Sequence, residues 1–158
     1  MKVVQGKNTI TVTATDKAGN QATATKEIYV YHQIVIKITI DNPVVTIDDV
    51  PQPALEAAPF MWQGRTMVPV RVIAEGLGAP VNYDAVTKAV TVILGNDTIF
   101  MKVDDKNATI NGRSVLLDAP PLNRSGRVFI PVRFVSEAFK AEVTWDQATR
   151  TVTVMYKK

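Results

Sequence analysis

One passage of this sequence occurs twice. Residues 64–75 read GRTMVPVRVIAE and residues 126–137 read GRVFIPVRFVSE, at a constant offset of 62 residues. The same offset joins Asp84 to Asp146 further along the chain. A long internal repeat of this kind indicates two copies of one supersecondary unit that bury a shared core. We therefore expect a fold with an internal two-fold repeat.

Each half, about residues 43–103 and 104–156, combines strand and helix patterns. An apolar strand leads into a short helix that opens at Pro69 in the first half and at Pro131 in the second, because proline is favoured in the first helical turn. A β-hairpin is expected after each helix. The inward stripe of the first helix follows the i, i+3, i+4, i+7 spacing and consists of Val70, Ile73, Ala74 and Leu77.

Charged residues recur at equivalent positions of the two expected helices. Arg71 and Glu75 are four residues apart, as are Arg133 and Glu137, so each pair lies on one side of its helix. The guanidinium groups are expected to reach nearby backbone carbonyls as well. Because both copies carry the pair, we interpret all four residues as structural framework and not as a binding site.

Two aspartates precede the turns of the expected hairpins. A carboxylate at Asp84 or Asp146 can accept backbone N–H bonds across the turn, and Thr87 or Thr149 completes it. We assign both aspartates to the structural framework.

The residues before the repeat form a separate β-rich region. Residues 7–30 alternate as two strands around the turn residues 16–20, and residues 31–40 continue as a β-rich connector. The hairpin resembles the last two strands of bacterial immunoglobulin-like surface domains. We therefore divide the chain into residues 1–40, a remnant of such a domain with its connector, and residues 41–158, the repeat domain.

Composition excludes several classes of site. The chain has no cysteine, so disulfides, thiolate metal sites and thiol nucleophiles are absent from it. A net charge of +3 with scattered lysines and arginines favours weak attraction to polyanions over a dedicated nucleic-acid surface. No apolar run reaches the roughly 20 residues that a membrane helix needs. Neither nucleic acid binding nor a membrane span is expected.

The doubled passage identifies a family. Together with residues 75–79 and 84–92 and their counterparts as far as Val154, it resembles the copper amine oxidase N-terminal-like domain, also called the stalk domain. The resemblance covers about residues 43–156. It implies an α+β fold in which a twisted antiparallel sheet wraps around short helices. It also implies a secreted or wall-associated bacterial protein whose module carries no catalytic residues.

The family name invites a test for copper and quinone chemistry. Residues 82–84 read NYD, which partly matches the motif around the quinone tyrosine of amine oxidases, but Ala79 stands where that motif has threonine. A copper site of that class needs three histidines, and the chain has only His32. Tyr83 is equivalent to Trp145, so we interpret it as a large strand residue before a turn. No enzyme activity, cofactor or metal is expected.

Positions that differ between the copies are the best places for contact with a ligand. Most aromatic residues of the repeats, Trp145 among them, are expected to pack in the core. Trp62 lies in a proline-flanked loop and corresponds to Arg124, so these two are the candidate ligand contacts. Gly78 suits a left-handed helix end, whereas its counterpart Lys140 implies a different or slightly strained ending.

We therefore expect a non-catalytic cell-envelope module that serves as a spacer, in adhesion or in binding wall polymers within a larger surface protein. Its expected location is extracellular or at the cell wall, with the export signal outside this chain. The expected partners are cell-wall polymer or neighbouring surface domains. The alternative is a protein-interaction or oligomerisation element, in which the hairpin of residues 7–30 adds its strands to another sheet.

Overall fold

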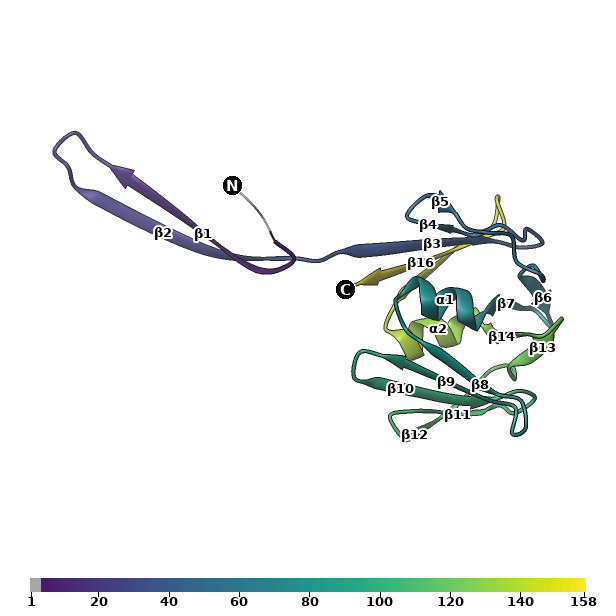
Figure 1. Ribbon diagram of the computed structural model, residues 1–158. Helices are drawn as coiled ribbons and strands as arrows, with labels where there is room; N and C mark the ends of the chain where they lie inside the picture. Colours follow the sequence, from purple (N-terminus) through teal and green to yellow (C-terminus); the bar gives the residue numbers. More distant parts are fainter. Residues whose placement is uncertain (1–3) are drawn as a thin grey trace. The chain divides into compact units, whose positions relative to one another are not determined.

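The computed structural model describes residues 4–158, except for the side chain of Ser136. The chain divides into two compact units (Figure 1). The first comprises residues 4–33 with Lys157 and Lys158, and the second comprises Ile34–Tyr156. The sequence predicted that the second domain starts at residue 41. The second unit starts earlier, at Ile34, because it includes one more strand, which is described below.

The first unit is the hairpin that the alternating pattern predicted. Strands β1 (Gly6–Thr15) and β2 (Gln21–Val30) pair antiparallel along their whole length. At the turn, the Asp16 carboxylate accepts the backbone N–H groups of Ala18 and Asn20 at 2.8 and 2.9 Å. Most side chains of the two strands are exposed. A two-stranded hairpin of this kind is marginal in water without a further packing surface.

The second unit contains three sheets and two short helices (Figure 1). One five-stranded sheet has the order β12-β11-β10-β9-β8, with bounds Arg113–Leu116, Asn107–Ile110, Asp97–Lys102, Ala89–Leu94 and Val81–Asp84. The four-stranded sheet has the order β13-β14-β7-β6, with bounds Leu122–Arg124, Arg127–Pro131, Arg65–Pro69 and Phe60–Trp62. The other five-stranded sheet has the order β15-β16-β3-β4-β5, with bounds Glu142–Asp146, Thr151–Lys157, Gln33–Thr39, Thr46–Ile47 and Val50–Pro51.

The helices are α1 (Val70–Gly76) and α2 (Val132–Phe139), and each follows a strand directly. Strands β7 and β14 pair antiparallel and end at Pro69 and Pro131, which have extended dihedral angles and cap the helices. The sequence predicted that the prolines lie in the first helical turn. In the structure they precede that turn. Neither helix in the described part of the chain is long and apolar enough to cross a membrane.

The hydrophobic core includes residues of both helices, which lie between sheets in the ribbon view (Figure 1). The predicted inward stripe of α1 is confirmed, because its four residues are at most 2% exposed. The largest fully buried side chains include Phe129 on β14 and Phe139 on α2. Phe60 of β6 packs on the Phe129 ring with 5.0 Å between the ring centroids. The fold is thus mostly β structure that encloses two short helices.

Strand β3 belongs to this core and not to a connector. Its isoleucines Ile34, Ile36 and Ile38 are buried, and Ile40, which follows the strand, is buried too. Gly76 at the end of α1 allows close packing on β3, since a Cβ atom there would lie 2.7 Å from Ile36 Cδ1. The second unit therefore begins at β3, before the predicted residue 41.

The two helices end in left-handed conformations, but with different residues. Gly78 has φ +79° in the first copy, as predicted. Lys140 adopts φ +54° in the second, a conformation that costs a residue with a Cβ atom more than it costs glycine. The Lys140 ammonium donates to Asp97 Oδ2 at 2.6 Å, and this bond and one from Asn111 hold the pKa of Asp97 below its usual value.

Candidate ligand-binding cleft

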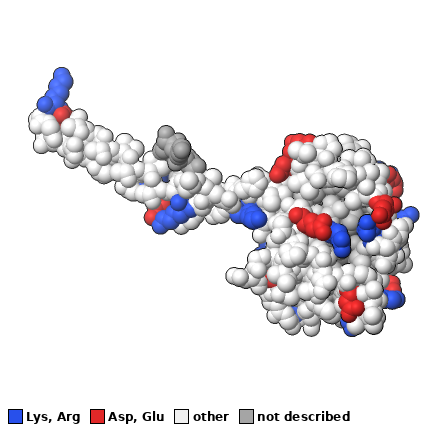
Figure 2. All heavy atoms as spheres, viewed as in Figure 1, with Lys and Arg blue, Asp and Glu red and all other residues white. Residues whose placement is uncertain are grey.

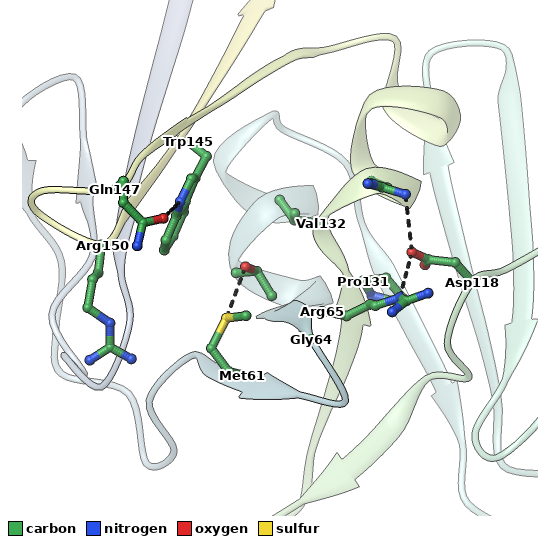
Figure 3. A pocket seen from close by; sticks show the side chains of 11 residues that line it. Met61, Gly64, Arg65, Asp118, Pro131, Val132, Trp145, Gln147 and Arg150 are labelled. Carbon is green, nitrogen blue, oxygen red and sulfur yellow. Dashed lines mark hydrogen bonds and ion pairs between the residues drawn. The ribbon is translucent and has the colours of Figure 1, made fainter.

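The second unit has a cleft of about 520 Å³. Its walls come from segments that are distant in sequence: β6 and β7, the loop before β13, the start of α2, and the turn between β15 and β16. The lining residues are Met61, Gly64, Arg65, Thr66, Asp118, Pro131, Val132, Arg133, Trp145, Gln147 and Arg150. Figure 3 shows Trp145 and Gln147 at one side of the cleft and Asp118 at the other, with Val132 between them in this view.

Trp145 provides an aromatic surface in the cleft. It lies on β15 opposite Val152 and is 41% exposed, so the prediction that it packs in the core was wrong. The indole N–H donates to Gln147 Oε1 at 2.9 Å, which holds the ring (Figure 3). Its counterpart Tyr83 is half-buried and packs against the core. An exposed indole whose N–H is satisfied offers its faces to a ligand.

Positive charge gathers around the same cleft. Arg65 Nε donates to Asp118 Oδ2 at 3.1 Å, and Arg133 Nη1 lies 3.9 Å from that oxygen (Figure 3). Arg150 also lines the cleft, and its Nη1 lies 3.1 Å from Oδ2 of Asp41, which does not line the cleft. Three arginines and one carboxylate therefore line it. This charge balance suits a ligand that carries negative charge, since arginine binds carboxylate and phosphate groups through its forked donors.

The two predicted ligand contacts lie elsewhere. Trp62 is half-buried on β6 and pairs with Arg65, whereas Arg124 lies on β13, the opposite edge strand of the same sheet. The Arg124 guanidinium lies 4.6 Å from the centroid of the Phe60 ring, a cation–π contact. Neither Trp62 nor Arg124 lines the cleft.

The predicted framework pairs differ between the two helices. Arg71 Nε lies 3.8 Å from Glu75 Oε1, with both side chains about half exposed. Arg133 is 82% exposed and reaches Asp118 outside its own helix, while Glu137 is exposed. An exposed pair at this distance adds little stability. Arg133 thus lines the cleft, and its structural role stays a prediction.

The hairpin turns carry the predicted aspartates. Asp84 accepts the hydroxyl of Thr87 at 2.7 Å and the N–H of Val86 at 2.9 Å. These bonds, the hydroxyl first, hold the pKa of Asp84 below its ordinary value. Equivalent bonds from Thr149 and then from the N–H of Ala148 lower the pKa of Asp146.

These turns predict how stability depends on pH. A carboxyl whose pKa is lower in the folded state contributes stability above its unfolded pKa, and the contribution is lost as pH falls through the folded pKa. We expect the melting temperature to drop as pH falls below 3.8, the ordinary value. The Asp84→Asn/Asp146→Asn double variant should melt lower at neutral pH and lose less on acidification, as measured by circular dichroism. An acid loss equal to that of the wild type would contradict the role of the turns.

The residues considered for copper and quinone chemistry lie in different elements. No three histidine, aspartate or glutamate residues within residues 4–158 form a group that could hold an ion. His32 follows β2, where its backbone carbonyl accepts the N–H of Lys158 at 2.9 Å. Tyr83 lies on β8 opposite Val90. Tyr83 thus lies in a strand, and His32 lies in the segment that follows β2.

Sequence reasoning did not single out Arg65, Asp118 or Arg150. Arg65 belongs to the doubled passage, and its twin Arg127 lies 3.1 Å from Glu56, so the repeat alone does not tell the two apart. Asp118 and Arg150 lie in a loop and a turn, where charged residues are ordinary. Only the pairing of distant strands brings these residues together.

Comparison with known proteins supports the resemblance found in the sequence. A "Protease inhibitor" from Brevibacillus choshinensis is 36% identical over 81 residues, which cover 51% of this chain. The matched part spans about a quarter of that relative, 25% of its length. Residues 46–154 match the family described as the copper amine oxidase N-terminal domain. Because this match covers more than half of the sequence, the chain belongs to the copper amine oxidase N-terminal domain family.

Proposed function

We propose that this chain is a non-catalytic accessory module of a bacterial cell-envelope protein and that its cleft binds an anionic wall polymer. The observation that carries the proposal is the lining of the cleft, which includes an exposed indole, three arginines and one carboxylate. The proposed location is outside the cell or at the wall, where such polymers occur.

Family membership supports an accessory role. The matched family is the N-terminal domain of copper amine oxidases, and the resemblance implies a module that carries no catalytic residues. The chain spans about a quarter of the Brevibacillus relative, so a larger protein would supply any activity that the module assists. Within such a protein the module would hold its neighbours near the wall.

Among possible polymers, the side chains that line the cleft favour a glycan that carries negative charge. An indole face can stack on a sugar ring, and guanidinium groups bind phosphate or carboxylate in a bidentate manner. On the face drawn in Figure 2, acidic and basic side chains of the second unit lie beside each other without forming a block of one sign. Attraction by the net charge of +3 is accordingly weak, and the local arginines would provide the selectivity.

A sedimentation assay with purified cell walls tests this proposal. Trp145→Ala and Arg133→Met should each raise the dissociation constant at low salt about fivefold, since each removes one contact worth on the order of 1 kcal/mol. Trp62→Ala is the matched control, because it removes the other tryptophan outside the cleft. High salt should weaken the wild type. Equal binding by Trp145→Ala, Arg133→Met and the wild type would overturn the proposal.

A second candidate function rests on the hairpin. Within residues 4–158, β1 and β2 pair only with each other, so each leaves one edge open. Val12 is 62% exposed on the apolar side of the hairpin. Such strands can complete another sheet, either that of an immunoglobulin-like domain or that of a second chain. Light scattering after size exclusion tests this: a dimer that becomes monomeric without residues 1–32 supports strand addition, and an unchanged monomer excludes self-association.

A further inference from the structure

The single carboxylate in the cleft is placed where it can influence ligand choice. Asp118 lies in the loop between β12 and β13, and its side chain is 27% exposed. It is the one acidic residue among the described residues that line the cleft. The same oxygen, Oδ2, approaches both Arg65 and Arg133. Any anion that binds these guanidinium groups would therefore meet Asp118.

The contacts of Asp118 with Arg65 and Arg133 differ in length. The contact with Arg65 is a hydrogen bond of 3.1 Å, and Arg65 also donates to the carbonyl of Gln63 at 3.1 Å. The contact with Arg133 is longer, 3.9 Å, and the Arg133 side chain is 82% exposed. An ion pair of this length and exposure has a small free energy, so a ligand anion can replace it at little cost. Two hydrogen bonds hold the Arg65 guanidinium group.

We infer that Asp118 is an internal competitor for the ligand's anionic group and thereby determines the specificity of the cleft. This inference rests on the proposed function. With Asp118 beside Arg133, a single phosphate or carboxylate gains the arginine but is repelled by the aspartate. A glycan chain that repeats its negative charge overcomes this repulsion, because further anionic groups reach Arg150 and a sugar ring reaches Trp145. The cleft thus selects polyanionic glycans over isolated anions and neutral glycans.

The test measures dissociation constants by titration calorimetry for the full chain. The probes are teichoic acid for repeated phosphate, polygalacturonate for repeated carboxylate, inorganic phosphate as an isolated anion, and dextran as a neutral glycan. Asp118→Asn should bind inorganic phosphate about fivefold more tightly than the wild type, the gain expected from removing one exposed like charge. The gain for the preferred polyanion should be smaller, so that the preference for the polyanion over phosphate narrows. Dextran binding should not change.

The control variant is Asp104→Asn, which changes the net charge by the same amount away from the cleft. Asp104 pairs with Lys88 at 3.6 Å and has φ +67°, which asparagine tolerates well. Asp104→Asn should bind as the wild type does. Equal gains in both aspartate variants would show an effect of net charge and overturn the inference while the proposed function stands.

Two other results would also decide the matter. Weaker anion binding by Asp118→Asn would show that the carboxylate only positions its arginines, which overturns the competition. If neither the wild type nor Asp118→Asn binds any anion while both keep the same melting temperature, the proposed function fails and the inference fails with it. The polymer that responds to Asp118→Asn identifies phosphate or carboxylate as the recognised group.

Discussion

Removal of residues 1–32 is expected to leave the stability of the second unit nearly unchanged, whereas removal of residues 1–40 is expected to prevent this unit from folding. The additional eight positions include Ile34, Ile36, Ile38 and Ile40, which are at most 7% exposed. Each buried isoleucine contributes about 1.5–3 kcal/mol, so together they contribute on the order of 10 kcal/mol. A small domain has about 5–15 kcal/mol in total. The longer deletion should therefore leave no folded state.

Thermal unfolding followed by circular dichroism and calorimetry distinguishes the two deletions. The variant without residues 1–32 should show one cooperative transition close to that of the full chain. The variant without residues 1–40 should show none and should resemble a denatured chain at every temperature. A cooperative transition in the longer deletion would contradict the assignment of β3 to the core and would favour the boundary at residue 41.

Phe139→Ala is expected to lower the free energy of unfolding by about 3–5 kcal/mol, the usual cost when a buried aromatic side chain leaves a cavity. Phe139 is fully buried at the end of α2, in the position equivalent to Leu77 of α1. Phe100 on β10 is only half-buried, so Phe100→Ala is the matched control with a clearly smaller loss. Urea denaturation measures both losses. Equal losses would show that α2 does not pack in the core as described.

Features set by neighbouring residues could be predicted from the sequence. The inward stripe of α1 is fixed by helical spacing, and it is buried as expected. The turns at Asp84 and Asp146 form because the carboxylate and a threonine three residues later bond to each other and to the backbone. The pair Asn111-Gly112 is typical of a type I′ turn, which requires positive φ at both positions, and both residues have positive φ.

Features that depend on contacts between segments far apart in the sequence could not be predicted in this way. The isoleucines of β3 alternate in the same manner whether a strand joins a sheet or links two domains, so the boundary was placed too late. Trp145 was expected in the core along with most aromatic residues of the repeats, yet it and its twin Tyr83 lie in different sheets with different neighbours. The cleft joins residues from segments between Met61 and Arg150, and no local pattern marks such a combination.

The most direct test of the cleft uses the two tryptophans of the chain. Each indole N–H gives one signal in a nitrogen–proton correlation spectrum, so both candidate contacts are observed in one titration with soluble wall glycan. The Trp145 signal should shift as glycan is added, because its N–H lies in the cleft beside Gln147, while the Trp62 signal stays in place. A shift of Trp62 alone, or of neither signal at saturating glycan, would contradict the account.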